Sequence, residues 1–96
     1  MKSLEEIEEI LKNHKPELKS KFKVEKVGIF GSYIHGKQTK ISDVDLLVKL
    51  SEPIGWEFID LKEYLEKVLS VKVDVVTIKA LKPQLKDLIL NEVVYA

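Results

Sequence analysis

The chain contains no cysteine, which excludes disulfide-stapled scaffolds and thiolate zinc sites. It also contains no arginine, so no guanidinium fork of this chain can clamp a phosphate in a bidentate manner. Its 16 lysines balance 16 acidic residues, and zero net charge argues against direct binding of nucleic acid through the phosphate backbone. Because no apolar run reaches about 18 residues and no signal-peptide pattern opens the chain, we expect a cytoplasmic protein without a membrane partner.

The 96 residues fit one domain, residues 1–96, with the ordinary apolar content of 45%. A chain of this length buries only about 60–65% of its unfolded surface, so its core is thin. A substrate cleft in such a protein is either shallow or completed by a partner, and an oligomer is compatible with that requirement.

Runs rich in apolar and β-branched residues predict three strands, at residues 24–30, 43–50 and 71–78. Gly31-Ser32 stops the first strand, a short helical turn is expected at 33–36, and the polar residues 37–42 read as a loop. The tail 93–95 is expected to form a short edge strand or to pack against a partner.

Apolar residues at helical spacing predict three helices. The first opens at a capping box of Ser3 and Glu6, and Pro16 is expected to end or kink it. The second covers 56–69. The last begins near Pro83, with an expected buried face of Leu85, Leu88 and Ile89.

The pattern with chemical content is Gly31-Ser32, ten residues, then Asp43-Val44-Asp45. Strand alternation places both carboxylates on one face with Cα atoms roughly 6.6 Å apart. Asp74 lies in the third strand, which a crossover helix makes parallel to the second. The first two strands are joined by only about a dozen residues, and if Gly31-Ser32 and Asp43 act at one site, these strands are antiparallel. The predicted fold class is therefore α/β (α+β), a small mixed sheet packed by helices.

Three carboxylates on one face, without arginine to neutralise them, predict hard divalent cations: two Mg²⁺ ions, or Mn²⁺. The glycine lets the backbone approach a ligand closely, and the turn after it points N–H groups at an anion. A phosphate-binding turn beside an acidic cluster predicts a nucleoside triphosphate and two-metal phosphoryl or nucleotidyl transfer.

These residues resemble the minimal nucleotidyltransferases of the DNA polymerase β superfamily, over nearly the whole chain. The matching stretches are Phe30-Gly31-Ser32-Tyr33, Asp43-Val44-Asp45 and Val73-Asp74-Val75-Val76. The resemblance implies that Asp43 and Asp45 coordinate both metals, and that Asp74 holds the catalytic metal and helps to deprotonate the acceptor. It also implies that Gly31 and Ser32 hold the triphosphate.

Such proteins often occur as the antitoxin beside a HEPN-domain ribonuclease toxin, and the resemblance implies transfer of AMP from ATP to a toxin hydroxyl. Two alternatives stay open: nucleotidyl transfer to a small molecule, and an antitoxin that acts by docking alone. His35 stands where family members commonly carry arginine, so a contact that needs a permanent positive charge is in question.

Overall fold

The computed structural model describes residues 2–39 and 43–96, so Lys40 and Ser42 of the predicted loop lie outside the described residues. The helices are α1 (Leu4–Phe22), α2 (Glu57–Leu69) and α3 (Pro83–Glu92). The strands are β1 (Val24–Phe30), β2 (Val44–Leu50), β3 (Val73–Thr77) and β4 (Val94–Tyr95). Two short 3₁₀ turns, η1 (Gly31–Tyr33) and η2 (Ile78–Ala80), follow β1 and β3, so the first helical turn begins two residues earlier than predicted.

The four strands form one mixed sheet in the order β3-β2-β1-β4. β1 is antiparallel to both β2 and β4, whereas β2 and β3 are parallel and joined through α2. This confirms the predicted topology, including the tail as an edge strand. In the part of the chain that the structure describes, no helix has both the length and the apolarity needed to cross a membrane.

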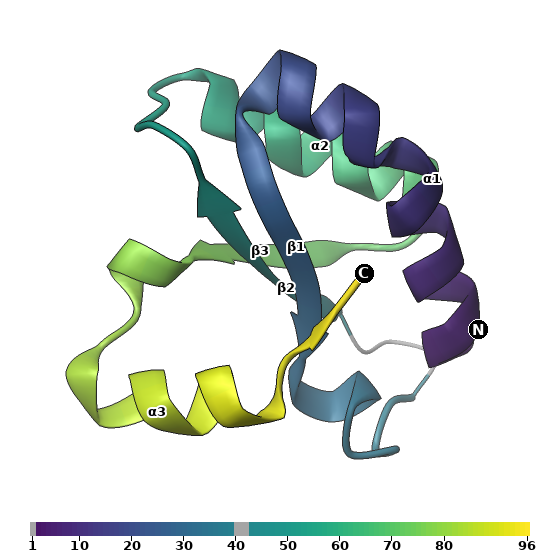
Figure 1. Cartoon of the computed structure of the whole chain (residues 1–96). Helices are drawn as coiled ribbons and strands as arrows, with labels where there is room; N and C mark the ends of the chain where they lie inside the picture. Colours follow the sequence, from purple (N-terminus) through teal and green to yellow (C-terminus); the bar gives the residue numbers. More distant parts are fainter. Residues whose placement is uncertain (1, 40–42) are drawn as a thin grey trace.

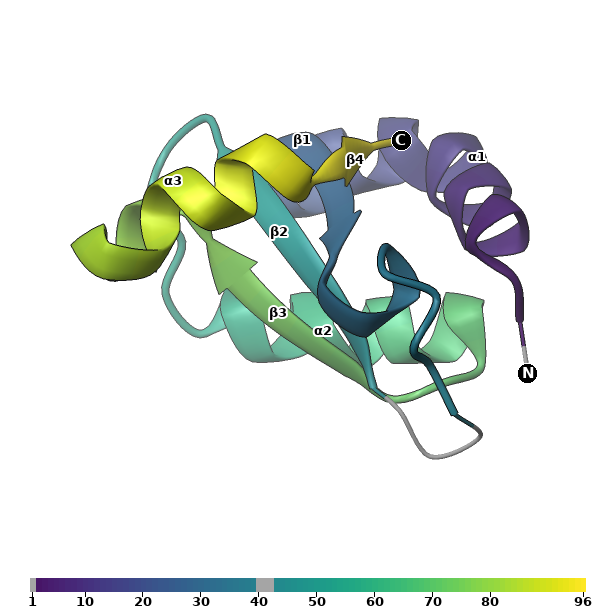
Figure 2. The same cartoon turned by 90° about the horizontal axis from the view of Figure 1, so that it is seen from below.

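Helices α1 and α2 cover one face of the sheet, and α3 lies on the other (Figures 1 and 2). The core fills the space between the sheet and the first two helices, and its fully buried members include Ile7, Leu11, Leu46, Leu61 and Leu65. On the β2 strand, alternation sends Val44, Leu46 and Val48 into this core. Asp45 and its alternate neighbours therefore face the side that carries α3.

Helix α1 is continuous through Pro16, so of the two predicted outcomes, an end or a kink, the helix does not end there. The capping box of Ser3 and Glu6 forms as predicted, with Ser3 Oγ accepting from Glu6 N–H at 3.1 Å. Both halves of the helix bury apolar residues against the sheet, which offsets the backbone hydrogen bond that proline cannot make. Figure 1 shows the helix changing direction along its length, as expected of a helix with an internal proline.

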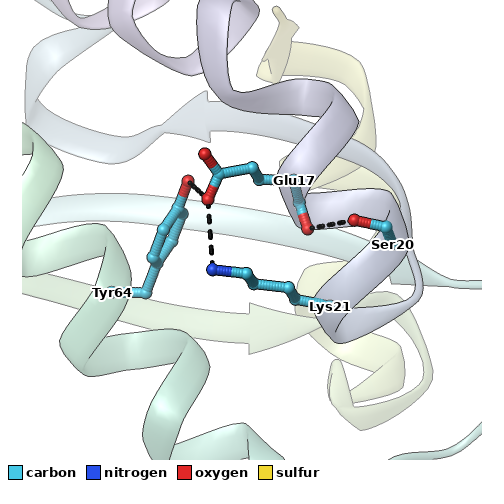
Figure 3. A network of polar contacts seen from close by, with 4 residues as sticks. All are labelled: Glu17, Ser20, Lys21 and Tyr64. Atoms are coloured by element: carbon cyan, nitrogen blue, oxygen red, sulfur yellow. Dashed lines mark hydrogen bonds and ion pairs between the residues drawn. The ribbon is translucent and has the colours of Figure 1, made fainter.

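A polar network fastens α1 to α2 (Figure 3). Tyr64 donates its hydroxyl proton to Glu17 Oε2 at 3.1 Å, and Lys21 Nζ lies 3.4 Å from the same oxygen. Burial, followed by the Glu17 carboxylate that accepts this hydrogen bond, raises the pKa of Tyr64 to about 12. The tyrosine is therefore a neutral structural donor, on the opposite side of the sheet from the acidic residues.

Helix α3 buries no residue completely, so its predicted buried face is wrong. Leu85 is 47% exposed and Leu88 is 61% exposed, while Ile89 is half-buried. Helical spacing identified an amphipathic helix, but α3 lies on the face of the sheet opposite the core formed with α1 and α2 (Figure 2), and its apolar stripe remains largely exposed there.

Candidate active site

The parallel pairing of β2 with β3 places Asp45 directly opposite Asp74. Register partners on neighbouring strands point to the same face, so the two side chains stand side by side. Asp43 is exposed and immediately precedes β2, two residues before Asp45. The structure thus brings the three predicted carboxylates to one end of the neighbouring strands β2 and β3.

Asp74 is exposed on the edge strand β3. An exposed carboxylate is solvated by water and needs no charged partner in the protein. The exposure of Asp74 therefore gives no sign of a functional role. What distinguishes the residue is its position across from Asp45 rather than its desolvation.

The Gly31-Ser32 turn packs directly against Asp45. Phe30, the last residue of β1, is the register partner of Asp45, and Gly31 has a left-handed backbone with φ +79°. A Cβ built at Gly31 would overlap Asp45 Oδ2 and lie 3.0 Å from Cγ. Only glycine both adopts this conformation easily and leaves room for the carboxylate.

The turn is closed by its own backbone. The carbonyl oxygen of Gly31 accepts hydrogen bonds from Ile34 N–H at 3.0 Å and His35 N–H at 3.3 Å, and Ser32 O accepts from Lys37 N–H at 2.9 Å. Tyr33, the last residue of η1, is buried in the core, and Ser32 is half-buried. This places the serine beside Gly31 at the edge of the acidic cluster.

Burial, together with the neighbouring carboxylates, raises the pKa of Asp45 from the usual 3.8 to about 6. Burial is the largest cause, followed by the negative charges of Asp74, Asp43 and Glu92. Three acidic groups therefore repel the charged form of Asp45 at this end of the sheet, and a cation would relieve that repulsion.

The donor set fits a hard divalent cation, because all three predicted ligands are carboxylates on one face. Among residues 2–39 and 43–96, no three acidic or histidine side chains already converge closely enough to enclose an ion. Mutual repulsion disfavours such convergence until a cation is bound, so these side chains would have to rotate toward a common point.

Asparagine at position 45 is expected to stabilise the cation-free protein at pH 8. The raised pKa means that the folded state holds a proton more tightly than the unfolded state, so the ionised carboxylate destabilises the fold above pH 6. The full effect would be at most about 3 kcal/mol, and solvent screening of this half-exposed group reduces it to about 1–2 kcal/mol.

Thermal unfolding of the parent and of Asp45→Asn, in the presence of a metal chelator and from pH 8 to pH 4, measures this difference in stability. The advantage of Asp45→Asn should shrink as the pH falls through 6 and become small at pH 4, where the parent carboxyl is protonated in the folded state and about half protonated in the unfolded state. A lower melting temperature for Asp45→Asn at pH 8 would contradict the repulsion described above.

Glu92 belongs to the site, although the sequence analysis did not include it. Its Oε1 accepts a hydrogen bond from Gly31 N–H at 3.1 Å, and its Oε2 lies 2.7 Å from His35 Nε2. The signal is the pairing of β4 with β1: Ile29 opposes Val94, so continuing the antiparallel register places Glu92 beside Gly31.

Two sizeable cavities lie away from the carboxylates. One, of about 430 Å³, lies between α1 and β1; the other, of about 320 Å³, is formed by the far ends of β2 and β3 and the start of α2. Neither is lined by Asp43, Asp45 or Asp74. Cavity size therefore does not mark the site, and the acidic residues stand on a more open surface.

Comparison with known proteins shows the family to which this chain belongs. A family model described as a nucleotidyltransferase domain matches residues 11–96. The chain belongs to the nucleotidyltransferase family. This nucleotidyltransferase is 48% identical over 96 residues to the protein adenylyltransferase MntA of Thermococcus cleftensis, a match that covers 99% of this chain and 97% of the relative.

A solved structure assigned as a minimal nucleotidyltransferase matches with a TM-score of 0.76 at 32% identity, covering 97% of this chain and 95% of that chain. These similarities confirm the predicted family, fold class and enzyme class.

Two toxin–antitoxin complexes share the fold of this nucleotidyltransferase at lower identity. One, solved with AMP-PNP, gives a TM-score of 0.68 at 23% identity and covers 95% of this chain and 69% of that chain. The other contains a tri-AMPylated HEPN toxin of Shewanella oneidensis with its MNT antitoxin; it gives 0.59 at 20% identity and covers 95% and 66%.

Proposed function

We propose that this nucleotidyltransferase transfers AMP from ATP to a hydroxyl of a partner protein, and that it is the antitoxin of a HEPN-type toxin. The observation that carries the chemistry is the packing of the Gly31-Ser32 turn against Asp45, opposite Asp74. The protein acceptor is supported by the similarity to MntA, a protein adenylyltransferase, and by the AMPylated toxin in the complex with a similar fold. A cytoplasmic setting follows from that partnership.

In this proposal Asp43, Asp45 and Asp74 hold two Mg²⁺ ions, with Mn²⁺ as a substitute. When bound, the ions would neutralise the negative charge of the triphosphate and the charge that develops on the reacting oxygens. Gly31 and Ser32 hold the phosphates: the glycine allows close backbone approach, and the serine hydroxyl donates a hydrogen bond.

The proposed reaction is a nucleophilic displacement at the α-phosphorus of ATP. The acceptor oxygen forms a bond to the α-phosphorus of ATP, the bond from that phosphorus to the bridging oxygen of the β-phosphate breaks, and pyrophosphate leaves. The hydroxyl proton goes to a carboxylate of the cluster. Asp74 is suited to receive it because it lies exposed at the sheet edge, where an acceptor can approach.

An acceptor presented by a partner fits the open position of the carboxylates. The chain carries no arginine, so a partner could also contribute a fixed cation for the transferred phosphate, as trans-acting arginines do in other phosphoryl transfers.

The proposal is tested by incubating the chain and ATP–Mg²⁺ with a purified HEPN-type toxin or with small alcohols. An increase in toxin mass by AMP units supports it; rapid modification of small alcohols by the chain alone, or tight docking without transfer, contradicts it.

Ser32→Ala is expected to weaken ATP binding by about 1–3 kcal/mol, the usual value for losing a hydrogen bond to a charged group. Calorimetry should therefore show a Kd about 5 to 150 times higher. Ser20→Ala is the matched control, because this exposed serine lies on α1 and its hydroxyl donates to Glu17 O of the same helix. Equal ATP affinity in the parent and Ser32→Ala would assign the turn a purely structural role.

A further inference from the structure

Glu92 ties the last turn of α3 to the Gly31-Ser32 turn. Its side chain is only 17% exposed, although α3 has no fully buried residue. One carboxylate oxygen accepts from Gly31 N–H at 3.1 Å and the other lies 2.7 Å from His35 Nε2. A single side chain thus contacts both the first residue of the turn and the histidine that follows it.

These two contacts restrain the turn from outside. An ionised carboxylate can only accept hydrogen bonds, so the His35 nitrogen that faces it carries the proton. The backbone bonds to Gly31 O and Ser32 O close the turn internally, whereas Glu92 fixes its entry at Gly31 N and its side chain at His35. Ser32 lies between these two fixed points.

We propose that Glu92 is a positioning residue for nucleotide binding, which holds the Gly31–His35 turn in the conformation that receives the triphosphate. This inference rests on the proposed function, because it assigns the phosphates to that turn. A turn that is already ordered loses less conformational freedom on binding, so the clamp favours the complex. In this proposal the contribution of α3 is to carry Glu92 to the turn, because the helix itself packs only loosely on the sheet.

The direction in which ATP affinity changes when Glu92 is replaced distinguishes a positioning role from a purely electrostatic one. Glu92 contributes to the negative charge around Asp45, so its removal relieves repulsion of a triphosphate and by itself predicts tighter ATP binding. Loss of the clamp predicts weaker binding. Because the two effects have opposite signs, a single affinity measurement distinguishes them.

Glu92→Gln preserves the shape of the side chain but leaves one acceptor oxygen where the carboxylate has two. We expect its Kd for ATP–Mg²⁺ to rise about tenfold, which corresponds to about 1.4 kcal/mol. Its Kd for Mn²⁺ without nucleotide should not rise. Asp87→Asn is the matched control, since it removes one negative charge from an exposed position on the same helix and should bind ATP like the parent.

A double-mutant cycle with His35 supplies the second measurement. His35 is 53% exposed, so His35→Ala should fold normally. It should weaken ATP binding, and adding Glu92→Gln to it should cost much less than in the parent because the shared contact is already lost.

Unchanged or tighter ATP binding by Glu92→Gln, or fully additive losses in the cycle, would overturn the positioning role while leaving the proposed function intact. A parent protein that does not bind ATP–Mg²⁺ would overturn both. If Glu92→Gln fails to fold, normal ATP binding by His35→Ala contradicts the clamp.

Discussion

Asparagine in place of Asp45 is expected to abolish nucleotidyl transfer, with a rate at least about 10³ times lower than that of the parent. Asp45 lies opposite Asp74, against the Gly31 backbone and in the field of Asp43, so it occupies the centre of the proposed cation site. An amide keeps the shape but removes the charge that holds a divalent cation. Single-turnover transfer to the partner toxin measures the loss.

The same substitution should leave partner docking intact, which separates catalysis from binding. Asp60→Asn is the control, because Asp60 is exposed on α2, across the sheet from the site. Transfer by Asp45→Asn within tenfold of the parent would remove this carboxylate from the proposed mechanism.

Gly31→Ala is expected to reduce transfer at least about a hundredfold. The added methyl overlaps Asp45 Oδ2, so the carboxylate must rotate away from its place, and the left-handed backbone costs a further about 1–2 kcal/mol. A misplaced ligand or phosphate contact of about 1 Å is enough for a loss of this order. Steady-state transfer rates measure the effect on catalysis, and a melting curve measures the loss of stability.

Gly36→Ala separates those parts. Gly36 also has a positive φ, +68°, but a Cβ there meets no atom within 4 Å. It should therefore show a similar loss of stability with nearly normal transfer. Equal transfer rates for the two alanine variants would show that the contact between Gly31 and Asp45 has no functional weight.

Much of the site was predictable because it depends on local patterns. Alternation in β2 placed Asp43 and Asp45 on one face, and the helix-length crossover made β3 parallel, so that Asp74 became a neighbour. The short connection after Gly31 made β1 antiparallel and returned the turn to Asp45. None of these steps needed knowledge of how the helices pack.

The incorrect or missing parts depend on tertiary packing. Pro16 lies within α1 because burial of Leu11 and Leu18 on either side outweighs one lost backbone bond. The apolar residues of α3 remain largely exposed because α3 lies on the opposite face of the sheet from the core that α1 and α2 help to form (Figure 2). Glu92 reaches Gly31 only through the pairing of β4 with β1, a contact between residues 61 positions apart.

Transfer of isotopic label tests the proposed adenylyl transfer most directly. The chain, Mg²⁺ and a HEPN-type partner are incubated with ATP labelled at the α-phosphate or, in parallel, at the γ-phosphate. Adenylyl transfer predicts that the α-label enters the partner protein while the γ-label leaves in pyrophosphate, and that Asp45→Asn supports neither event. Retention of the γ-label on the partner, or transfer of neither label by the parent protein, would contradict it.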